Sequence, residues 1–124
     1  MRKKWGPFIG GILIGFIIMI MNYKHVVTSD EVIYRGNIVY EKTTDKPLTG
    51  TLKEYYENEQ LKAEINYKKG KLDGKFFIYY PDGKLCQKGT YKKNVLHGKV
   101  KIYNEKGKLL RVIEYKKGFP LTIN

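Results

Sequence analysis

The sequence predicts an all-β protein, an antiparallel β-meander of repeated hairpins with one N-terminal transmembrane or signal helix. Three observations lead to this prediction. Several residue types recur every 24 positions, the composition suits strands and turns, and an uncharged apolar run follows the first four residues. The 124 residues suffice for one domain with a core of modest size.

The composition favours strands joined by tight turns. Tyr occurs 11 times and Gly 13 times, whereas alanine occurs only at Ala63. Tyr and β-branched residues are enriched in strands and Gly in turns, and a helical bundle is expected to use more Ala. Alternation along the strand candidates places the more apolar side chains on one side. We therefore expect one face of the sheet to be better covered than the other.

The 24-residue period appears in five independent series of positions. The most regular is a tetrad, Tyr-Lys-Lys-Gly at 67–70, Tyr-Lys-Lys-Asn at 91–94 and Tyr-Lys-Lys-Gly at 115–118. The other series are Gly50, Gly74 and Gly98; Leu61, Leu85 and Leu109; Tyr55, Tyr79 and Tyr103; and Leu48, Leu72 and Leu96. This agreement indicates stacked structural repeats that stabilise one another.

The middle copy shows how one unit is built. A strand is predicted over residues 75–80, a turn over 81–84, a return strand over 85–91 and a loop over 92–97. Pro81 fixes φ at the first corner of the turn, and Gly83 accepts the positive φ that ends it. The first copy carries Glu59 where the others carry Gly, so its turn is expected to be the least regular.

Three segments are expected along the chain. Residues 1–23 form an N-terminal hydrophobic anchor or signal segment, residues 24–47 a linker and degenerate capping repeat, and residues 48–124 the repeat domain. The uncharged run 5–23 has 19 residues, about 28 Å as a helix, close to the roughly 30 Å of a hydrocarbon core. Arg2, Lys3 and Lys4 before it predict a cytoplasmic N-terminus and a repeat domain outside the cytoplasm. The alternative is a signal peptide cleaved near Ser29, which gives a secreted domain.

Two stretches of the middle of the chain resemble MORN repeats, the membrane occupation and recognition nexus motif. They are Tyr-Lys-Lys-Gly-Lys-Leu-Asp-Gly-Lys at 67–75 and Tyr-Tyr-Pro-Asp-Gly-Lys-Leu at 79–85. The resemblance covers about residues 48–118 and is closest to the bacterial variant grouped with YwqK-like antitoxins. It implies a hairpin-repeat fold and a role in protein interaction or phospholipid association, with antitoxin components among similar proteins.

Positive charge is concentrated in the C-terminal half of the chain. The net charge is +12, and residues 68–124 hold 15 basic and 4 acidic residues, a balance of +11. Such asymmetry favours an anionic partner, and the alternative is a general lysine-rich bias of composition. The lysine doublets recur at one loop position and should line one edge, and tyrosines recur in the strands. The candidate binding residues are Lys68, Lys69, Lys92, Lys93, Lys116, Lys117, Tyr55, Tyr79 and Tyr103. The alternative for the doublets is that they protect sheet edges and loops from aggregation.

No pattern of residues points to catalysis. His97 occupies the repeat position of Thr49 and Asp73, a turn position that varies among polar residues. The single cysteine, Cys86, has no equivalent cysteine in the other copies, and His25 lies too far from His97 in sequence for a metal-ligand spacing. We therefore expect no enzyme activity, no cofactor and no metal.

The function expected from the sequence is that of a membrane-anchored, non-catalytic repeat module that binds a protein or an anionic lipid surface. Residues 5–23 attach it to the membrane. Nucleic acid is not an expected partner of a domain outside the cytoplasm. The alternative is an antitoxin-like component of a toxin–antitoxin system that binds its toxin, which the expected anchor disfavours because toxins are usually neutralised in the cytoplasm.

Overall fold

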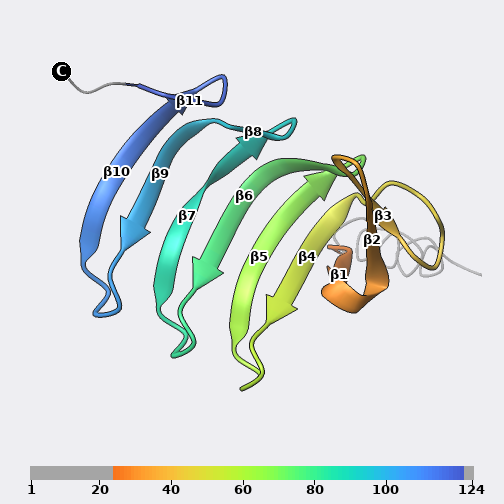
Figure 1. The fold of residues 1–124 in the computed structure, drawn as a ribbon, viewed down its shortest axis with the longest axis horizontal. Coiled ribbons are helices and arrows are strands. Elements are labelled where there is room, and N and C mark those ends of the chain that lie inside the picture. Colours follow the sequence, from red (N-terminus) through yellow and green to blue (C-terminus); the bar gives the residue numbers. More distant parts are fainter. Residues whose placement is uncertain (1–23, 122–124) are drawn as a thin grey trace, which may run out of the picture.

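The computed structural model describes residues 24–121 (Figure 1). The helix expected over residues 5–23, whether anchor or signal, lies outside these residues. Within 24–121, no helix has both the length and the apolar character needed to cross a membrane. The described chain is built almost wholly from strands, as the sequence predicts.

The repeats form one continuous antiparallel sheet, which confirms the predicted meander of hairpins. Its strands lie side by side in chain order in Figure 1, with turns at alternating ends. The long strands are β4 (Gly50–Tyr55), β5 (Leu61–Lys68), β6 (Lys71–Tyr79), β7 (Leu85–Lys92), β9 (Gly98–Tyr103) and β10 (Leu109–Lys116). Two short strands, β8 (Val95–Leu96) and β11 (Phe119–Pro120), pair with the ends of β7 and β10.

The start of the described chain departs from the simple meander. β1 (Val26–Thr28) pairs with β4 in parallel, with Val26 beside Thr51. Between them the chain passes through a 3-10 turn, η1 (Ser29–Glu31), and a separate hairpin of β2 (Val32–Arg35) and β3 (Ile38–Glu41). Parallel neighbours need a crossover connection, and the chain between β1 and β4 supplies it.

The turns at one end of the hairpins share one geometry. In each, the residue before the turn accepts a hydrogen bond from the third turn residue, as Tyr80 O does from Gly83 N–H at 2.9 Å. The third residue has positive φ, +90° at Gly83 and +84° at Gly107, the pattern of a three-residue hairpin turn. The expectation that Glu59 makes the first turn the least regular is wrong. Glu59 adopts φ +68° and donates the same hydrogen bond, at 3.0 Å.

The turns between repeats are tighter than the loop expected over 92–97. The strands on either side pair up to Lys92 and Val95, which leaves only Lys93 and Asn94 at the corners. Both corner residues have positive φ in each of the three turns: Lys69 and Gly70, Lys93 and Asn94, Lys117 and Gly118. Positive φ at both corners is the signature of a type I′ turn, whose twist matches that of the flanking strands.

Backbone and tyrosine hydrogen bonds tie each repeat to its neighbour. The second corner residue of each inter-repeat turn donates its N–H to a leucine of the preceding copy: Gly70 to Leu48 at 2.7 Å, Asn94 to Leu72 at 2.9 Å and Gly118 to Leu96 at 3.1 Å. At the other end, the hydroxyls of Tyr56 and Tyr80 donate to Tyr79 O and Tyr103 O of the following copy, at 2.6 and 2.7 Å. These bonds couple repeats that would be marginal as isolated hairpins.

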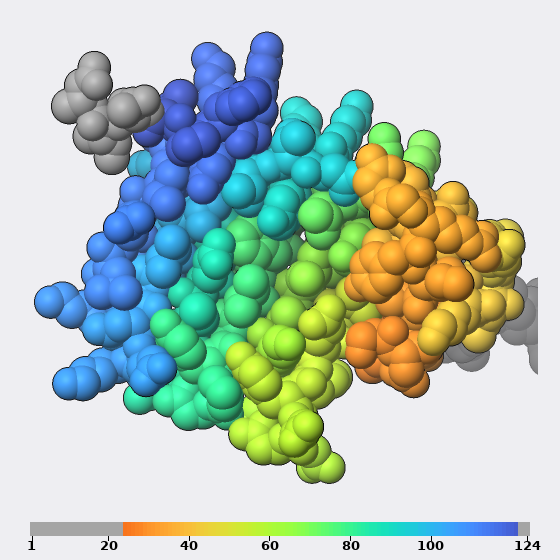
Figure 2. All heavy atoms as spheres, in the orientation of Figure 1, coloured from red at the N-terminus to blue at the C-terminus, as the bar shows by residue number. Residues whose placement is uncertain are grey.

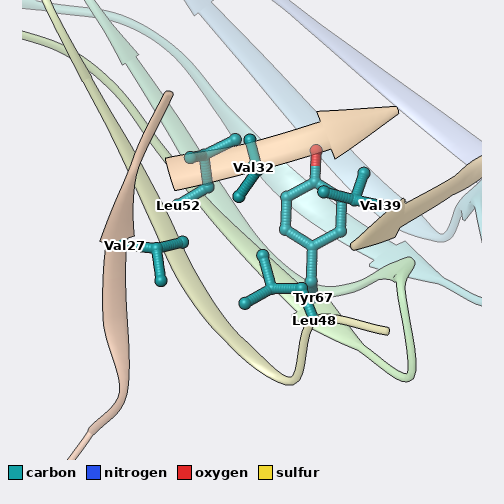
Figure 3. Close-up of a cluster of buried hydrophobic side chains, with 6 residues drawn as sticks. All are labelled: Val27, Val32, Val39, Leu48, Leu52 and Tyr67. Carbon is teal, nitrogen blue, oxygen red and sulfur yellow. The ribbon is translucent and has the colours of Figure 1, made fainter. Parts of the chain in front are cut away.

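The main core lies at the start of the sheet, where the β2–β3 hairpin packs over one face. Figure 3 shows its side chains converging from β1, β2, β3 and the first repeat. They are Val27, Val32, Val39, Leu48, Leu52 and Tyr67. Burial raises the pKa of the Tyr67 hydroxyl above its usual range, with a further contribution from the nearby Tyr34. In Figure 2 this N-terminal segment, in orange, covers the beginning of the array, and the blue C-terminal strands lie at the opposite side.

Further along the same apolar face, a large side chain on one strand packs against a glycine on the next strand. Phe76 is buried and lies directly opposite Gly89 across β6 and β7. The other copies carry Leu52 opposite Ile65 and Val100 opposite Ile113. The missing side chain at Gly89 leaves the space that Phe76 and Val100 fill: a Cβ there would lie 2.8 Å from Phe76 Cε1 and 2.9 Å from Val100 Cγ2.

Exchanging the residues of two equivalent turns tests the backbone geometry. Glu59→Gly is expected to raise the free energy of unfolding by about 0.5–1 kcal/mol, because a side chain in the left-handed region is strained. Gly107→Glu should lower it by about 1 kcal/mol through φ alone, since a Cβ at Gly107 meets no atom within 4 Å. Urea unfolding of both variants measures the two changes. If both substitutions changed the free energy of unfolding in the same direction, backbone φ would not be the cause of the two effects.

A double-mutant cycle tests the interlock at Gly89. Gly89→Ala is expected to destabilise the fold by about 1–3 kcal/mol, because the added methyl group overlaps Phe76 and Val100. Phe76→Leu opens space at that position, so the double variant should be more stable than Gly89→Ala alone. Thermal or urea unfolding of the four proteins gives the coupling free energy. Additive effects would show that the two positions do not share one space.

Candidate binding surfaces

The six lysines of the doublets lie together along one end of the sheet. We call this surface the basic turn edge, and it consists of Lys68, Lys69, Lys92, Lys93, Lys116 and Lys117. All six are exposed. Lysines of adjacent repeats line shared hollows: one of about 330 Å³ takes Lys68, Lys69 and Lys93, and one of about 410 Å³ takes Lys92, Lys93, Lys116 and Lys117. The edge expected from the 24-residue spacing is therefore present as a surface.

The backbone fixes where these lysines point. The first lysine of each doublet is the last residue of a strand, and the second is the first corner of the type I′ turn. The N–H of Lys69 donates to Thr49 Oγ1 at 2.9 Å, and that of Lys93 donates to Asp73 Oδ2 at 3.3 Å. His97 occupies the same repeat position as these two acceptors. Thr49 and Asp73 thus hold the turns, and the lysine side chains remain free to reach solvent or a ligand.

The three candidate tyrosines lie at the other end of the strands. Tyr55 pairs with Leu61, Tyr79 with Leu85 and Tyr103 with Leu109, the residues next to the three-residue turns. An eight-residue strand such as β5 separates the two ends by about 23 Å. The structure therefore does not bring the tyrosines and the lysine doublets into one surface. Partial burial, with a smaller contribution from the Glu64 carboxylate, raises the pKa of Tyr79.

A second basic surface lies on the face of the sheet opposite the apolar face. Lys75, Lys88, Lys99 and Lys101 surround a hollow of about 330 Å³ with Phe77 and Thr90, and the backbone at Gly89 completes it. We call this surface the lysine face. Its residues come from β6, β7 and β9, the middle of the array. The sequence did not predict this surface, because the meeting of Lys88 and Lys101 depends on the register of β7 against β9.

Comparison with known protein families identifies the repeats. Residues 48–69, 72–93 and 96–117 each match the MORN repeat variant, and together they make up more than half of the chain. The chain belongs to this MORN family. The three MORN copies begin 24 residues apart, which is the period of the sequence. No curated protein and no solved structure matches the chain. The finer resemblance to YwqK-like antitoxins finds no support in these comparisons.

The surfaces described above are the candidate binding surfaces of the MORN repeats. The matched family is a repeat module, and no catalytic family accompanies it. Cys86 is a free thiol of intermediate exposure, and His97 is an exposed turn residue. In residues 24–121, no group of three or more His, Cys, Asp or Glu side chains is arranged to hold a metal ion. The two basic surfaces and the tyrosine end carry lysine ammonium groups, tyrosine hydroxyls and apolar side chains.

Proposed function

We propose that this MORN protein is a non-catalytic binding module, anchored in the membrane by residues 5–23, whose basic turn edge rests on anionic lipid head groups. The repeat domain lies outside the cytoplasm in this proposal, because Arg2, Lys3 and Lys4 precede the apolar run. The family match supports a binding role. The choice of the turn edge and of a lipid partner comes from the geometry of β1.

The parallel pairing of β1 is the observation that carries this proposal. Val26 lies beside Thr51 and Thr28 beside Lys53, so β1 runs in the same direction as β4. β4 begins at Gly50, which pairs with Tyr67, next to the first lysine doublet. The chain therefore approaches β1 from the end of the sheet that carries the basic turn edge. A membrane segment before β1 brings that edge, and not the tyrosine end, toward the lipid.

The distance between the apolar run and the sheet is short. Only Lys24 and His25 separate Tyr23 from Val26, so at most about 10 Å of extended chain lies between them. This is close to the Debye length of roughly 8–10 Å at physiological ionic strength. Exposed lysines at that distance interact with anionic lipids by about 1 kcal/mol each. The six lysines of the turn edge are exposed, and residues 24–121 contain no ion pair that involves them.

Vesicle flotation with residues 24–124 tests the lipid assignment. We expect this fragment to float with vesicles that contain phosphatidylglycerol and not with pure phosphatidylcholine. Replacing Lys68, Lys92 and Lys116 with Gln should weaken partitioning roughly 100-fold, from the loss of about 1 kcal/mol per lysine. These are the strand-end lysines, so the left-handed corners stay intact.

The matched control removes the same charge at the tyrosine end, with Lys84, Lys106 and Lys108 replaced by Gln. All three are exposed and lie in or beside the three-residue turns. This control should float almost as the unmodified fragment does. Equal losses of flotation in both variants would show that lipid binding depends on net charge and not on where the lysines lie. Unchanged flotation of the turn-edge variant would refute the lipid assignment and favour a protein partner, to be sought by pull-down from membranes.

A reporter fusion tests the orientation. Alkaline phosphatase fused after Asn124 in the full-length chain is expected to be active, because this enzyme needs export to form its disulfides. A cytoplasmic reporter at the same position should be silent. The opposite pattern would contradict the orientation derived from the basic residues before the apolar run, and would restore the cytoplasmic alternative of a toxin-binding protein.

A further inference from the structure

We infer that the lysine face is a second anion site, which binds a soluble ligand carrying two or more phosphate groups. The site is centred on Lys88 and Lys101 and is separate from the basic turn edge. Its existence does not depend on the proposed function, because it uses other residues on another side of the sheet.

The site is a hollow in the middle of the sheet. Its volume, about 330 Å³, falls at the lower end of the range for small-molecule pockets. Lys75 stands on β6, Lys88 on β7, and Lys99 and Lys101 on β9, so three adjacent strands each contribute an ammonium group. Each of these strands has a neighbour on both sides in the sheet.

The arrangement of charge on this face is unfavourable without a ligand. Lys88 and Lys101 are direct cross-strand partners in β7 and β9. Like charges at directly opposite positions destabilise a sheet. Both side chains are of intermediate exposure, and none of the four lysines forms an ion pair in residues 24–121. A bound anion between the two strands would turn this repulsion into attraction.

The acidic residues near the hollow do not neutralise it. Glu64 lies on the same side of the sheet, opposite Phe77, but its carboxylate pairs with Lys24 at 3.3 Å. Glu114 is the cross-strand partner of Lys99 only, at the border of the cluster. Lys88 has Phe77 on one side and Lys101 on the other, so no carboxylate stands next to it in register.

The side chains of the hollow suit phosphate groups. Four ammonium groups around one space exceed what a single carboxylate can satisfy, whereas two or more phosphates supply several charges and many acceptor oxygens. The hydroxyl of Thr90 adds a neutral donor, since Lys75 and Thr90 are partners across β6 and β7. Phe77 forms an apolar wall, which accommodates a non-polar part of the ligand.

The position of the hollow favours a soluble ligand over a lipid head group. Lys88 lies four residues along β7 from Lys92, about 13 Å from the turn edge. Lys75 and Lys99 lie about half as far from it, since their cross-strand partners Thr90 and Glu114 are two residues from Lys92 and Lys116. If the turn edge rests on the membrane, as proposed above, the centre of the hollow at Lys88 and Lys101 stands clear of the head-group plane. This step alone rests on the proposed function.

Titration with inorganic tripolyphosphate tests the site. The protein is the full-length chain in phosphatidylcholine nanodiscs, and binding is measured by calorimetry. Replacing Lys88 and Lys101 with Gln should weaken binding about 10-fold or more. The matched control, Lys68→Gln with Lys116→Gln, loses the same charge at the turn edge and should bind within about twofold of the unmodified protein.

A stability measurement on the same variants separates a site from a generally basic surface. Without ligand, the Lys88/Lys101 variant should unfold at a higher temperature than the unmodified protein, because the cross-strand repulsion is gone. Its greater stability also shows that it folds. A lower unfolding temperature, absence of tripolyphosphate binding by the unmodified protein, or equal loss in both variants would overturn the inference.

Nanodiscs that contain phosphatidic acid distinguish the two sources of phosphate. We expect the protein to bind tripolyphosphate with the same affinity in these nanodiscs as in phosphatidylcholine nanodiscs. A fall in affinity that disappears in the Lys88/Lys101 variant would place head groups in the hollow and overturn the assignment to a soluble ligand. Flotation depends on Lys68, Lys92 and Lys116, so failure of the turn-edge proposal and failure of this inference give different results.

Discussion

Left-handed backbone at the turns between repeats is the constraint on which the rest of this structure depends. Both corners of each turn have positive φ, and the second corner donates its N–H to a leucine of the preceding repeat. Each turn thus connects one repeat to the next, and its hydrogen bond also holds the turn to the leucine of the repeat before it. It also fixes the first corner as an exposed position, and lysine occupies it in all three copies. The lysines at this corner therefore form a row, because the joints between repeats form a row.

The sequence predicts the repeating part of the fold well because the signals there are local. Gly83 and Gly107 mark turn positions with positive φ, and alternation marks the apolar face. Glu59 shows the limit of local reasoning: its flanking strands hold the same turn despite the strain of a side chain, since Tyr56 and Gln60 form the same closing hydrogen bond. Residues 24–47 lack the period, and their parallel strand and covering hairpin follow from long-range packing of Val27, Val32 and Val39.

The two basic surfaces differ in how far the sequence could reveal them. The turn edge follows the period, so six lysines at equivalent positions could be placed together in advance. The lysine face does not follow it, because the equivalents of Lys88 are Glu64 and Val112, and one equivalent of Lys101 is Phe77. Only the register of β7 against β9 brings these two lysines opposite each other. The 24-residue period therefore does not reveal a cluster of residues that differ between the repeats.

The direction of β1 relates these two surfaces to the start of the described chain, where the proposed membrane segment would join it. A parallel first strand fixes which end of the array meets the chain that arrives from residue 24, and that end carries the turn lysines. The strands then run away from this end, so under the proposed attachment the centre of the lysine face does not lie against the membrane. An antiparallel first strand would have turned the array over and presented the tyrosine end. In the two proposals, one strand pairing of three residues therefore keeps lipid contact and ligand binding on separate surfaces.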